Sequence, residues 1–299
     1  WSSDGAKAHA FQAKNIILAT GALERPVPIP GWTLPGVMTA GAAQILLKTA
    51  GMIPVGKIVI VGSGPLLLLV ADQLIKAGAD VEAVLDTTGV MDYVRGAPHL
   101  LRATKSWPYL QKGLKLKRAI KDAGVPIYSG AHEFLISGDG QAEQIGFTSG
   151  GLRRTLRVST VLLHQGVVPN TQASRQLRLA HGWHKTQRYW YPRVDEWGHS
   201  DVPAIFVAGD GAGVFGAKTA EIKGKLSALQ VAYLQGRISV QVRDNAAAPL
   251  LSELENHTSI RPMLDAIFVP PRDILNPPID ATIVCRCEEV TAGNVRDAA

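Results

Sequence analysis

The feature that most constrains this chain is a repeated pattern in which a short apolar run ends directly in a glycine turn. It occurs in the segments NIILATGA, IVIVGSGP, VLLHQGV and IFVAGDGAG. A short apolar run bounded by turn residues is typical of a strand that is buried on both faces, and such strands form parallel sheets joined by crossover helices. The pattern therefore predicts an α/β fold built from Rossmann-like domains.

Length and composition exclude several other classes of protein. A chain of 299 residues suits about two domains of ~150 residues each. The net charge of +6 arises from 31 basic and 25 acidic residues that are scattered along the chain, so a dense basic stripe for nucleic acid is not expected. The longest apolar run, Pro65–Ala71, is far shorter than the ~20 residues that a membrane-spanning helix needs.

Other segments depart from the parallel pattern. Helices are predicted near Ala42–Ala50 and Gly113–Ala123, and residues 133–160 alternate between apolar and polar positions with glycine turns, as antiparallel hairpins do. The aromatic-rich segment His181–Ser200 favours a hairpin that buries its aromatic side chains over a surface for a partner. Two double prolines mark Phe268–Ala281 as a linker, with a separate module after it.

The turn after the second apolar run carries the first two glycines of a GxGxxG motif. Gly62 allows the tight turn, and Gly64 lets a pyrophosphate approach the N-terminus of the following helix. Leu67 replaces the third glycine, so the helix should lie farther from the strand or face a small residue. Asp86 ends the next strand, where a carboxylate can bind a ribose 2′-hydroxyl, and no Arg follows it to accept a 2′-phosphate. The segment predicts a site for NAD or another adenine nucleotide, with a plain tight turn as the alternative.

The last glycine cluster follows a different logic. Asp210 ends a strand and can accept a hydrogen bond from a polyol, while Gly209 and Gly211 keep the backbone open ahead of a long helix. The alternative is a glycine-rich loop in which Asp210 only caps the helix.

Taken together, Ile17–Arg25 and the segments GSGP, HQGVVPN and VAGDGAG resemble the two-dinucleotide-binding-domain flavoproteins, the pyridine nucleotide-disulphide oxidoreductase-like superfamily. The resemblance implies an FAD-dependent oxidoreductase in which a nicotinamide-nucleotide domain is inserted into an FAD domain. An N-terminal GxGxxG and a CxxC pair beside the flavin, both features of that superfamily or its disulphide-reductase branch, are missing from this sequence. The implied cofactor-binding residues are Thr20, Gly21, Gly62, Gly64, Asp86, Gly166, Gly209, Asp210 and Gly211.

The same resemblance implies an order of segments along the chain. Residues 1–54 would form the first part of the FAD domain, residues 55–165 the inserted NAD-like domain, and residues 166–245 the second part of the FAD domain. Residues 246–281 would be a helical, proline-rich linker, and residues 282–299 the start of a small C-terminal module.

Cys285 and Cys287 are the two cysteines of the sequence. They are too few for a disulphide framework, which points to a reducing, cytoplasmic compartment. Thiolates bind iron or zinc, and a CxC pair can present both sulfurs to one ion, although two ligands do not complete a site. A mixed site with His199 or His257 and a pair of inert thiols are the alternatives.

The segment IVCRCEEVT resembles the opening of the [2Fe-2S] module of bacterioferritin-associated ferredoxins. In the FAD-containing subunits of opine oxidases, hydroxyproline and amino-acid dehydrogenases and a hydrogen cyanide synthase, this module follows the FAD domain through a proline-rich linker, as it does here. The resemblance implies that Cys285 and Cys287 supply half of a [2Fe-2S] site, and that segments beyond both ends of the chain complete the cofactor sites.

The expected function is therefore that of a flavoprotein subunit that passes electrons between FAD and a [2Fe-2S] cluster, within a hetero-oligomer that contains a second flavoprotein subunit. By resemblance the substrate is an amino acid or an opine-type amine. A stand-alone NAD(P)H-dependent reductase and a non-catalytic electron-transfer subunit are the alternatives. The sequence identifies no catalytic side chain.

Overall fold

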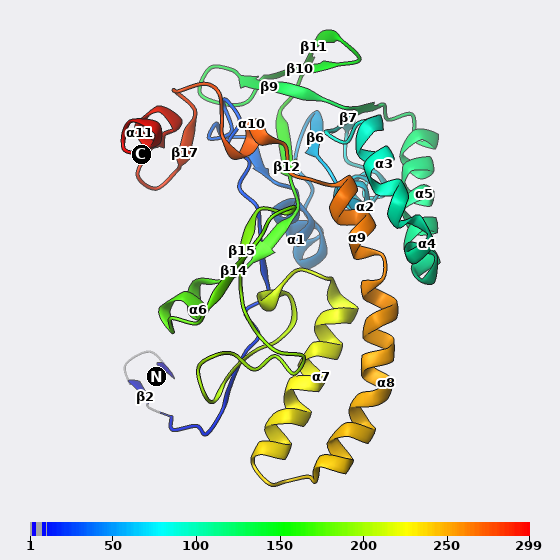
Figure 1. The fold of residues 1–299 in the computed structure, drawn as a ribbon. Helices are drawn as coiled ribbons and strands as arrows, with labels where there is room; N and C mark the ends of the chain where they lie inside the picture. The colour runs from blue at the N-terminus through cyan, green and yellow to red at the C-terminus, as the bar shows by residue number, and fades with distance from the viewer. Residues whose placement is uncertain (1, 4–7, 10) are drawn as a thin grey trace. The chain divides into compact units, whose positions relative to one another are not determined.

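The computed structural model describes residues 2–3, 8–9 and 11–299. The chain divides into two compact units, and each draws on two separate stretches of sequence. The first unit contains Trp1–Leu23 and Val168–Thr258, and the second contains Glu24–Val167 and Ser259–Ala299. Figure 1 traces the chain through both.

A parallel sheet forms the centre of the second unit. Within the part of the chain that the structure describes, this sheet has five strands in the order β5 (Val37–Thr39), β12 (Thr160–His164), β6 (Ile58–Gly62), β7 (Val81–Asp86) and β8 (Ile127–Ser129). Every neighbouring pair is parallel. The sheet confirms the α/β fold class that the apolar runs predict.

Helices cover one face of this sheet. They are α1 (Ala40–Ala50), α2 (Pro65–Lys76) and α5 (Trp107–Asp122), and α2 contacts both of the others. Successive strand residues point to opposite faces, so Ile58 and Ile60 of β6 join the core that contains the helix residues. Pro65 occupies the first turn of α2, where its missing N–H costs no hydrogen bond.

An antiparallel meander contributes to the core on the other face. It consists of β9 (His132–Ser137), β10 (Gln144–Ser149) and β11 (Leu152–Arg157), which confirms the hairpins predicted for residues 133–160. Val59 and Val61 of β6 share this core with side chains of the meander such as Phe147. The sheet is thus buried on both faces, as its near-continuous apolar strands require.

Short helices complete the second unit. They are α3 (Val90–Gly96), η1 (Ala97–His99), α4 (Leu100–Ala103), η2 (Thr104–Ser106) and α9 (Arg261–Ile267). A separate small core joins Ala103 to Ile260, Met263 and Ile267. Gly96 is required where α3 meets α9, because a Cβ at this position would lie 2.4 Å from Cγ1 of Ile267.

The proline-rich segment Phe268–Ala281 is not a free connector. It contains α10 (Arg272–Leu275), and Ile274 is only 1% exposed within the same core as the meander. An isoleucine between the two double prolines packs in the apolar core beside the sheet, so the segment is held on this unit, and its role as a linker stays a prediction. Beyond it lie β17 (Ile283–Cys285), β18 (Val290–Thr291) and α11 (Ala292–Asp297).

The first unit contains shorter strands and longer helices. Its strands β3 (Ile16–Leu18) and β16 (Ile205–Val207) pair in parallel, and β14 (His181–His184) pairs with β15 (Tyr189–Pro192) as a hairpin. Its remaining elements are β1 (Ser2–Ser3), β2 (Ala8–His9), α6 (Gln172–Gln176), η3 (Gly209–Ala212), α7 (Ala217–Leu234) and α8 (Val240–Thr258), and the unit boundary falls within β4 (Ala22–Glu24) and β13 (Val167–Pro169).

Two sequence predictions about burial in this unit hold only in part, because Leu18 of β3 packs on a core and Tyr189 of the hairpin is 6% exposed while their neighbours are not buried. Ile16 and Ile17 of β3 are exposed, and within the described residues β3 pairs only with β16. The aromatic hairpin forms as predicted, but Trp183 and Trp190 are 45% and 48% exposed. The two rings lie opposite each other across the hairpin, with centroids 5.3 Å apart. Each ring therefore covers part of the other on the surface, and neither is buried in a core.

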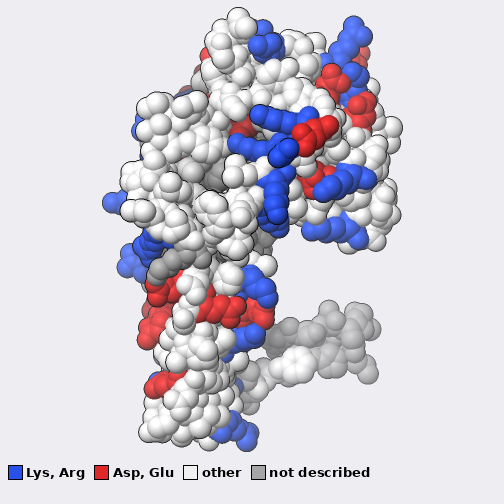
Figure 2. All heavy atoms as spheres, turned by 90° about the vertical axis from the view of Figure 1, so that its right-hand side faces the viewer, with Lys and Arg blue, Asp and Glu red and all other residues white. Residues whose placement is uncertain are grey.

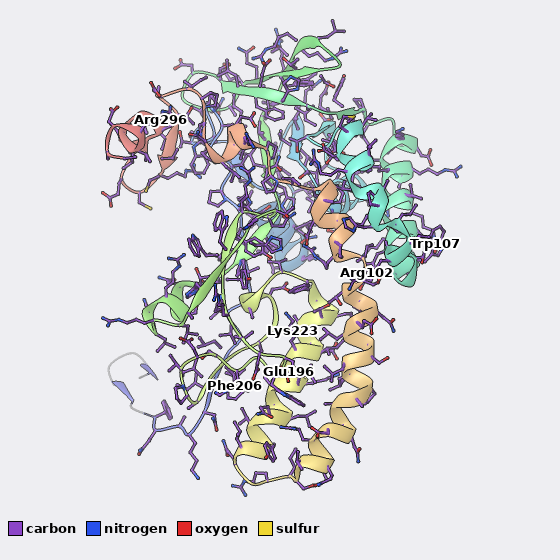
Figure 3. The ribbon with its side chains drawn as sticks, viewed as in Figure 1. Arg102, Trp107, Glu196, Phe206, Lys223 and Arg296 are labelled. Atoms are coloured by element: carbon purple, nitrogen blue, oxygen red, sulfur yellow. The ribbon has the colours of Figure 1, made fainter. Side chains whose placement is uncertain are left out.

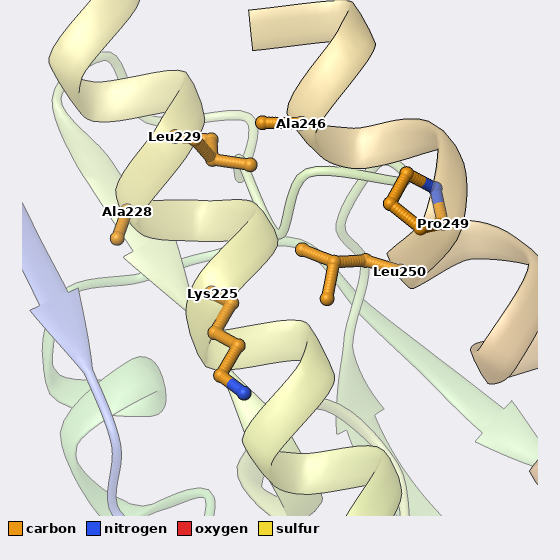
Figure 4. A pocket seen from close by; sticks show the side chains of 6 residues that line it. All are labelled: Lys225, Ala228, Leu229, Ala246, Pro249 and Leu250. Atoms are coloured by element: carbon orange, nitrogen blue, oxygen red, sulfur yellow. The ribbon is translucent and has the colours of Figure 1, made fainter.

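Helices α7 and α8 pack side by side as an antiparallel pair (Figure 1). Between them lies an apolar hollow of about 420 Å³, shown in Figure 4. Its lining is Lys225, Ala228, Leu229, Ala246, Pro249 and Leu250. Pro249 lies inside α8, where it removes one backbone hydrogen bond of the helix.

Charged side chains of both signs are mixed on the surface. On the face shown in Figure 2, Lys and Arg lie among Asp and Glu, with no continuous basic stripe. Among the described residues, no helix is both long and apolar enough to span a membrane.

The two units follow the predicted segments only in part. Residues 24–54 belong to the same unit as the inserted NAD-like segment, because β5 pairs with β12 and α1 packs on α2. Residues 259–299 belong to that unit as well, through α9 and Ile274. The assignment of FAD and NAD to these segments stays a prediction.

The packing of Ile274 can be tested by truncation. Ile274→Ala removes a fully buried side chain and leaves a cavity, so it should lower the free energy of unfolding by about 2–4 kcal/mol. Ile279→Ala, in the same segment but 51% exposed, is the matched control and should change stability by less than about 0.5 kcal/mol. Urea unfolding of both variants measures this, and equal effects would contradict the packing.

Candidate functional site

The GSGP turn lies where β6 and β12 come closest. A Cβ at Gly62 would lie 1.6 Å from the carbonyl oxygen of His164, so only glycine fits at this position. The same oxygen accepts a hydrogen bond from the N–H of Ser63, at 3.0 Å. Gly64 has a positive φ of 95° and open space where a Cβ would be, at the N-terminus of α2. The turn therefore leaves room for a ligand at free helix amides.

Leu67 follows this turn in place of the third glycine of the motif. It is fully buried in a core that also contains Ala40 and Ala43 of α1. The same core also contains large side chains such as Ile58 and Ile60, and the prediction that Leu67 faces a small residue stays a prediction.

A chain of polar side chains joins three strand ends beside the turn. The hydroxyl of Ser63 donates to Oε1 of Gln165 at 3.0 Å, and Nε2 of Gln165 donates to the hydroxyl of Thr87 at 3.1 Å. The N–H of Thr87 donates to the carbonyl of Gly62 at 2.8 Å. Gln165 therefore ties the ends of β6 and β7 to the residue after β12, and sequence reasoning did not single it out.

Asp86 lies at the carboxyl end of β7, directly opposite Gly62 in the register of the sheet. Its Oδ1 accepts a hydrogen bond from the N–H of Thr88 at 2.9 Å, and its Oδ2 lies 3.8 Å from Nζ of Lys117. Burial raises the pKa of the Asp86 carboxyl above its ordinary value, although Thr88 and Lys117 act in the opposite direction. Sequence reasoning missed Lys117, because it comes from α5, far along the chain.

A hollow of about 210 Å³ lies at the ends of β7 and β8 in the same unit. Its lining includes Thr87, the residue after Asp86, together with Asp92 of α3 and Ile274 of α10. The complete lining is Thr87, Gly89, Asp92, Gly130, Ala131, His132, Phe134, Pro271, Asp273 and Ile274. Carboxyl ends of parallel strands are the usual place for a ligand in an open α/β sheet.

A buried pair of ionisable side chains lies at the end of β12. Nδ1 of His164 is 2.6 Å from Oε1 of Glu24, and Oε2 of Glu24 accepts a hydrogen bond from the N–H of Gly41 in the first turn of α1. A Cβ at Gly41 would lie 2.5 Å from Oε2 of Glu24. His164 is thus a buried histidine whose Nδ1 has a hydrogen-bonding partner in the core.

In the first unit, two predicted turns lie side by side. A Cβ at Gly211 would be 3.0 Å from the hydroxyl of Thr20 and 3.6 Å from the N–H nitrogen of Gly21. That hydroxyl donates to the carbonyl of Asn170 at 3.0 Å, and the N–H of Asn170 donates to the carbonyl of Gly21 at 2.9 Å. The ATGA turn, the GDG turn and the PN segment therefore converge.

Asp210 holds the loop that leads into α7. Its Oδ1 accepts hydrogen bonds from the N–H groups of Phe215 at 2.9 Å and Gly216 at 3.1 Å. Gly209 adopts a positive φ of 69°, and a Cβ there would lie 3.1 Å from that of Ala220. The strand end thus approaches α7 closely, and the carboxylate organises the loop at the helix N-terminus.

Lys223 of α7, labelled in Figure 3, was also missed by sequence reasoning. Its Nζ lies 4.0 Å from the centroid of the Phe215 ring. Burial lowers the pKa of this amine to about 8, although the charge of Asp210 acts to raise it. Lys223 lies within α7, and its spacing from Asp210 along the chain carries no signal that the two side chains lie near each other.

The CxC segment contacts the proline-rich residues 26–35 of the second unit. The ring N–H of Trp32 donates to the carbonyl of Ile283 at 2.6 Å. Arg286, between the two cysteines, lies 5.1 Å from the Trp32 ring centroid and donates to the carbonyl of Thr33 at 3.3 Å. Cys285 is half-buried on β17, Cys287 is exposed, and both thiols are free.

The structure groups the predicted site residues into separate places. Thr20, Gly21, Gly209, Asp210 and Gly211 lie in the first unit. Gly62, Gly64, Asp86, Gly166, Cys285 and Cys287 lie in the second. Over residues 2–3, 8–9 and 11–299, no three His, Cys, Asp or Glu side chains form a group that could hold a metal ion.

Glycine turns at the ends of parallel strands are typical of dinucleotide-binding oxidoreductases. Residues 2–236 match the model of the family described as pyridine nucleotide-disulphide oxidoreductase, and the chain belongs to that family. The resemblance to two-domain flavoproteins is thereby confirmed.

Two relatives are similar to this chain over nearly its whole length. The chain is 41% identical to an opine oxidase subunit of Rhizobium meliloti, over 98% of this chain and 56% of the relative. It is 33% identical to the hydrogen cyanide synthase subunit HcnB of Pseudomonas aeruginosa, over 97% of this chain and 63% of that relative. The chain thus spans about half to two thirds of the length of these relatives.

A solved structure shares the fold at low sequence identity. The L-proline dehydrogenase of P. horikoshii is 16% identical, with a TM-score of 0.61 over 96% of this chain and 46% of that chain. The match supports the α/β fold.

The pKa of Lys223 predicts a dependence of stability on pH. The folded-state value of about 8 lies below the ordinary 10.5, so between these values the unfolded chain binds more protons and stability rises with pH. Lys223→Met removes the cost of burying the charge, and should raise the free energy of unfolding by about 2 kcal/mol at pH 7 but only slightly near pH 10.5.

Urea unfolding at pH 7, 8.5 and 10 measures this difference. Lys225→Met is the matched control on the same helix, because Lys225 is exposed and pairs with Glu221 at 2.7 Å. If the difference in free energy of unfolding between Lys223→Met and the unchanged protein were the same at all three pH values, the assigned pKa would be wrong.

Proposed function

We propose that this chain is part of an FAD-containing oxidoreductase subunit that passes electrons between flavin and a [2Fe-2S] cluster during oxidation of an amino acid or opine-type amine. The observation that carries the proposal is the convergence of the Thr20–Gly21 turn and the Gly209–Gly211 turn at the N-terminus of α7. The relation to the opine oxidase subunit of Rhizobium meliloti and to HcnB supports the class of substrate.

The first unit offers groups that suit FAD. Gly21 has a positive φ of 66° and open space at its Cβ position, so a ligand can approach its backbone. Asp210 would orient the ribityl chain, and the N-terminus of α7 would favour negative charge. Bound FAD would supply the redox chemistry, while these residues bind and orient it. Ile16 and Ile17 of β3 are both exposed, and that a further segment covers them and completes the site is part of the proposal.

The second unit offers groups that suit NAD or another adenine nucleotide. Gly64 leaves open space at the N-terminus of α2, and Asp86 lies at the end of the next strand. A pyrophosphate would accept hydrogen bonds from the free amides of α2, and the adenosine end would lie toward Asp86.

Cys285 and Cys287 suit half of a [2Fe-2S] site. Both thiols are free, and Trp32 and Arg286 fasten the segment that carries them. The other two ligands would come from a segment outside the described residues. Both relatives are named as subunits, which supports a multi-subunit enzyme. The proposal adds that a second flavoprotein subunit oxidises the carbon–nitrogen bond. A cytoplasmic location remains a prediction.

The intact GSGP turn favours one alternative, a stand-alone NAD(P)H-dependent reductase. Mixing the purified flavoprotein with NADH under anaerobic conditions separates the two. Rapid bleaching of the flavin by NADH alone would support the alternative. No bleaching by NADH, with reduction once the partner flavoprotein and an amine substrate are both added, is the expected result.

A substitution at Asp210 tests the FAD site. Asp210→Ala removes the acceptor for Phe215 and Gly216 and the carboxylate proposed to bind the ribityl chain, so the flavin content of the purified full-length protein should fall about tenfold. Asp201→Ala is the control, because Asp201 also accepts a backbone hydrogen bond but lies outside the glycine turns. The flavin absorption spectrum is the measurement, and equal flavin content in both variants would contradict the site.

Serine substitutions test the iron site. Cys285→Ser and Cys287→Ser should each lower the iron content of the full-length protein to less than about half, because a [2Fe-2S] cluster needs four ligands. Iron content and visible absorption are measured together with flavin content. Loss of iron with retained flavin is expected, and unchanged iron in both variants would exclude the two thiols as ligands.

A further inference from the structure

The fold brings a lysine next to the acid of the nucleotide site. Nζ of Lys117, on α5, lies 3.8 Å from Oδ2 of Asp86. The same amine donates a hydrogen bond to the hydroxyl of Tyr93 at 2.6 Å and lies 5.0 Å from the centroid of its ring. Tyr93 belongs to α3, so contacts from a second helix and from a strand end both hold Lys117 in place.

The pairing changes the charge of the site. An unpaired carboxylate at the end of this strand favours a ribose 2′-hydroxyl and repels a 2′-phosphate, whereas a cation there accepts the phosphate. Asp86 has Lys117 beside it, and the nearby Asp92 forms an ion pair with Arg95 at 3.1 Å. Each of these two carboxylates therefore has a cation beside it. The cation beside Asp86 offsets the repulsion that this carboxylate alone would exert on a 2′-phosphate.

The lysine side chain is more accessible to a phosphate from solvent than the carboxylate is. The side chain of Lys117 is 31% exposed and that of Asp86 only 4%. Oδ1 of Asp86 is already bonded to the N–H of Thr88. A phosphate that arrives from solvent would meet the amine before the carboxylate. The hollow of about 210 Å³ that starts at Thr87 provides adjacent space for the base of the same nucleotide.

We propose that Lys117 determines the specificity of this site and lets it bind an adenine nucleotide with a 2′-phosphate about as well as one without. The inference rests on the proposed nucleotide site of the second unit and deepens it. In this arrangement the phosphate replaces Asp86 as the partner of the Lys117 amine. The absence of an arginine after Asp86, from which the sequence favoured NAD, then does not decide the specificity.

The test is isothermal titration of the purified full-length protein with adenosine 2′,5′-bisphosphate and with 5′-AMP. The unchanged protein should bind the two probes with dissociation constants within about threefold of each other. Lys117→Met should weaken the bisphosphate about tenfold and leave 5′-AMP within about twofold. Lys117→Arg should keep most of the affinity for the bisphosphate, because it keeps the charge.

Lys115→Met is the matched control, since Lys115 is an exposed lysine on the same helix. It should leave both affinities unchanged, which separates a local contact from a general effect of net charge. An equal loss of both probes in Lys117→Met would overturn the proposal in favour of a structural role. A preference of the unchanged protein for 5′-AMP of more than about a hundredfold would also overturn it.

Binding of neither probe would overturn the inference together with the nucleotide site. The flavin spectrum of the same preparation reports the proposed FAD site independently. If the flavin spectrum is normal but Lys117→Met does not change the relative affinity for the two probes, the proposed function stands and the inference fails. If Lys117→Met weakens only the bisphosphate but the protein contains no flavin, the inference stands and the proposed function fails.

Discussion

The close approach of Gly62 to the carbonyl oxygen of His164 is the constraint on which the second unit depends. The side chain of any other residue at position 62 would overlap that oxygen, so β6 and β12 can pair fully to their carboxyl ends only with glycine there. The same approach lets Ser63 donate to His164 and brings Ser63 within reach of Gln165. The open turn at the start of α2 follows from it.

Burial on both faces fixes the rest of that unit. Alternate residues of the parallel strands belong to two different cores, one shared with helices and one with the antiparallel meander. Ile274 joins the second of these cores, so the segment that leads to the cysteines is held on the sheet. Trp32 and Arg286 then fasten the CxC segment itself. The burial of Ile274 and the contacts of Trp32 and Arg286 thus position the CxC segment. The prolines before it, taken alone, would suggest a loose attachment.

The sequence predicts what depends on neighbours along the chain. Apolar runs that end in glycine predict the parallel sheet, and alternation with glycine turns predicts the meander, because both patterns reflect local periodicity. Burial is predicted less well. Ile16 and Ile17 look like interior strand residues but are exposed, and Trp183 and Trp190 shelter each other on the surface. Whether an apolar side chain is covered depends on elements elsewhere, which a local pattern does not contain.

For the candidate sites, the sequence by itself determined the glycine turns, the acids at the strand ends and the CxC pair. It determined them because each requires a particular residue type at a particular spacing from a strand. Only the tertiary structure decided which charges meet them: Lys117 beside Asp86, and Lys223 near Asp210. Lysines are common on helices, and their spacing from a strand carries no signal. Their partners are set by how helices pack across the sheet ends, and so the charge of each site follows from packing.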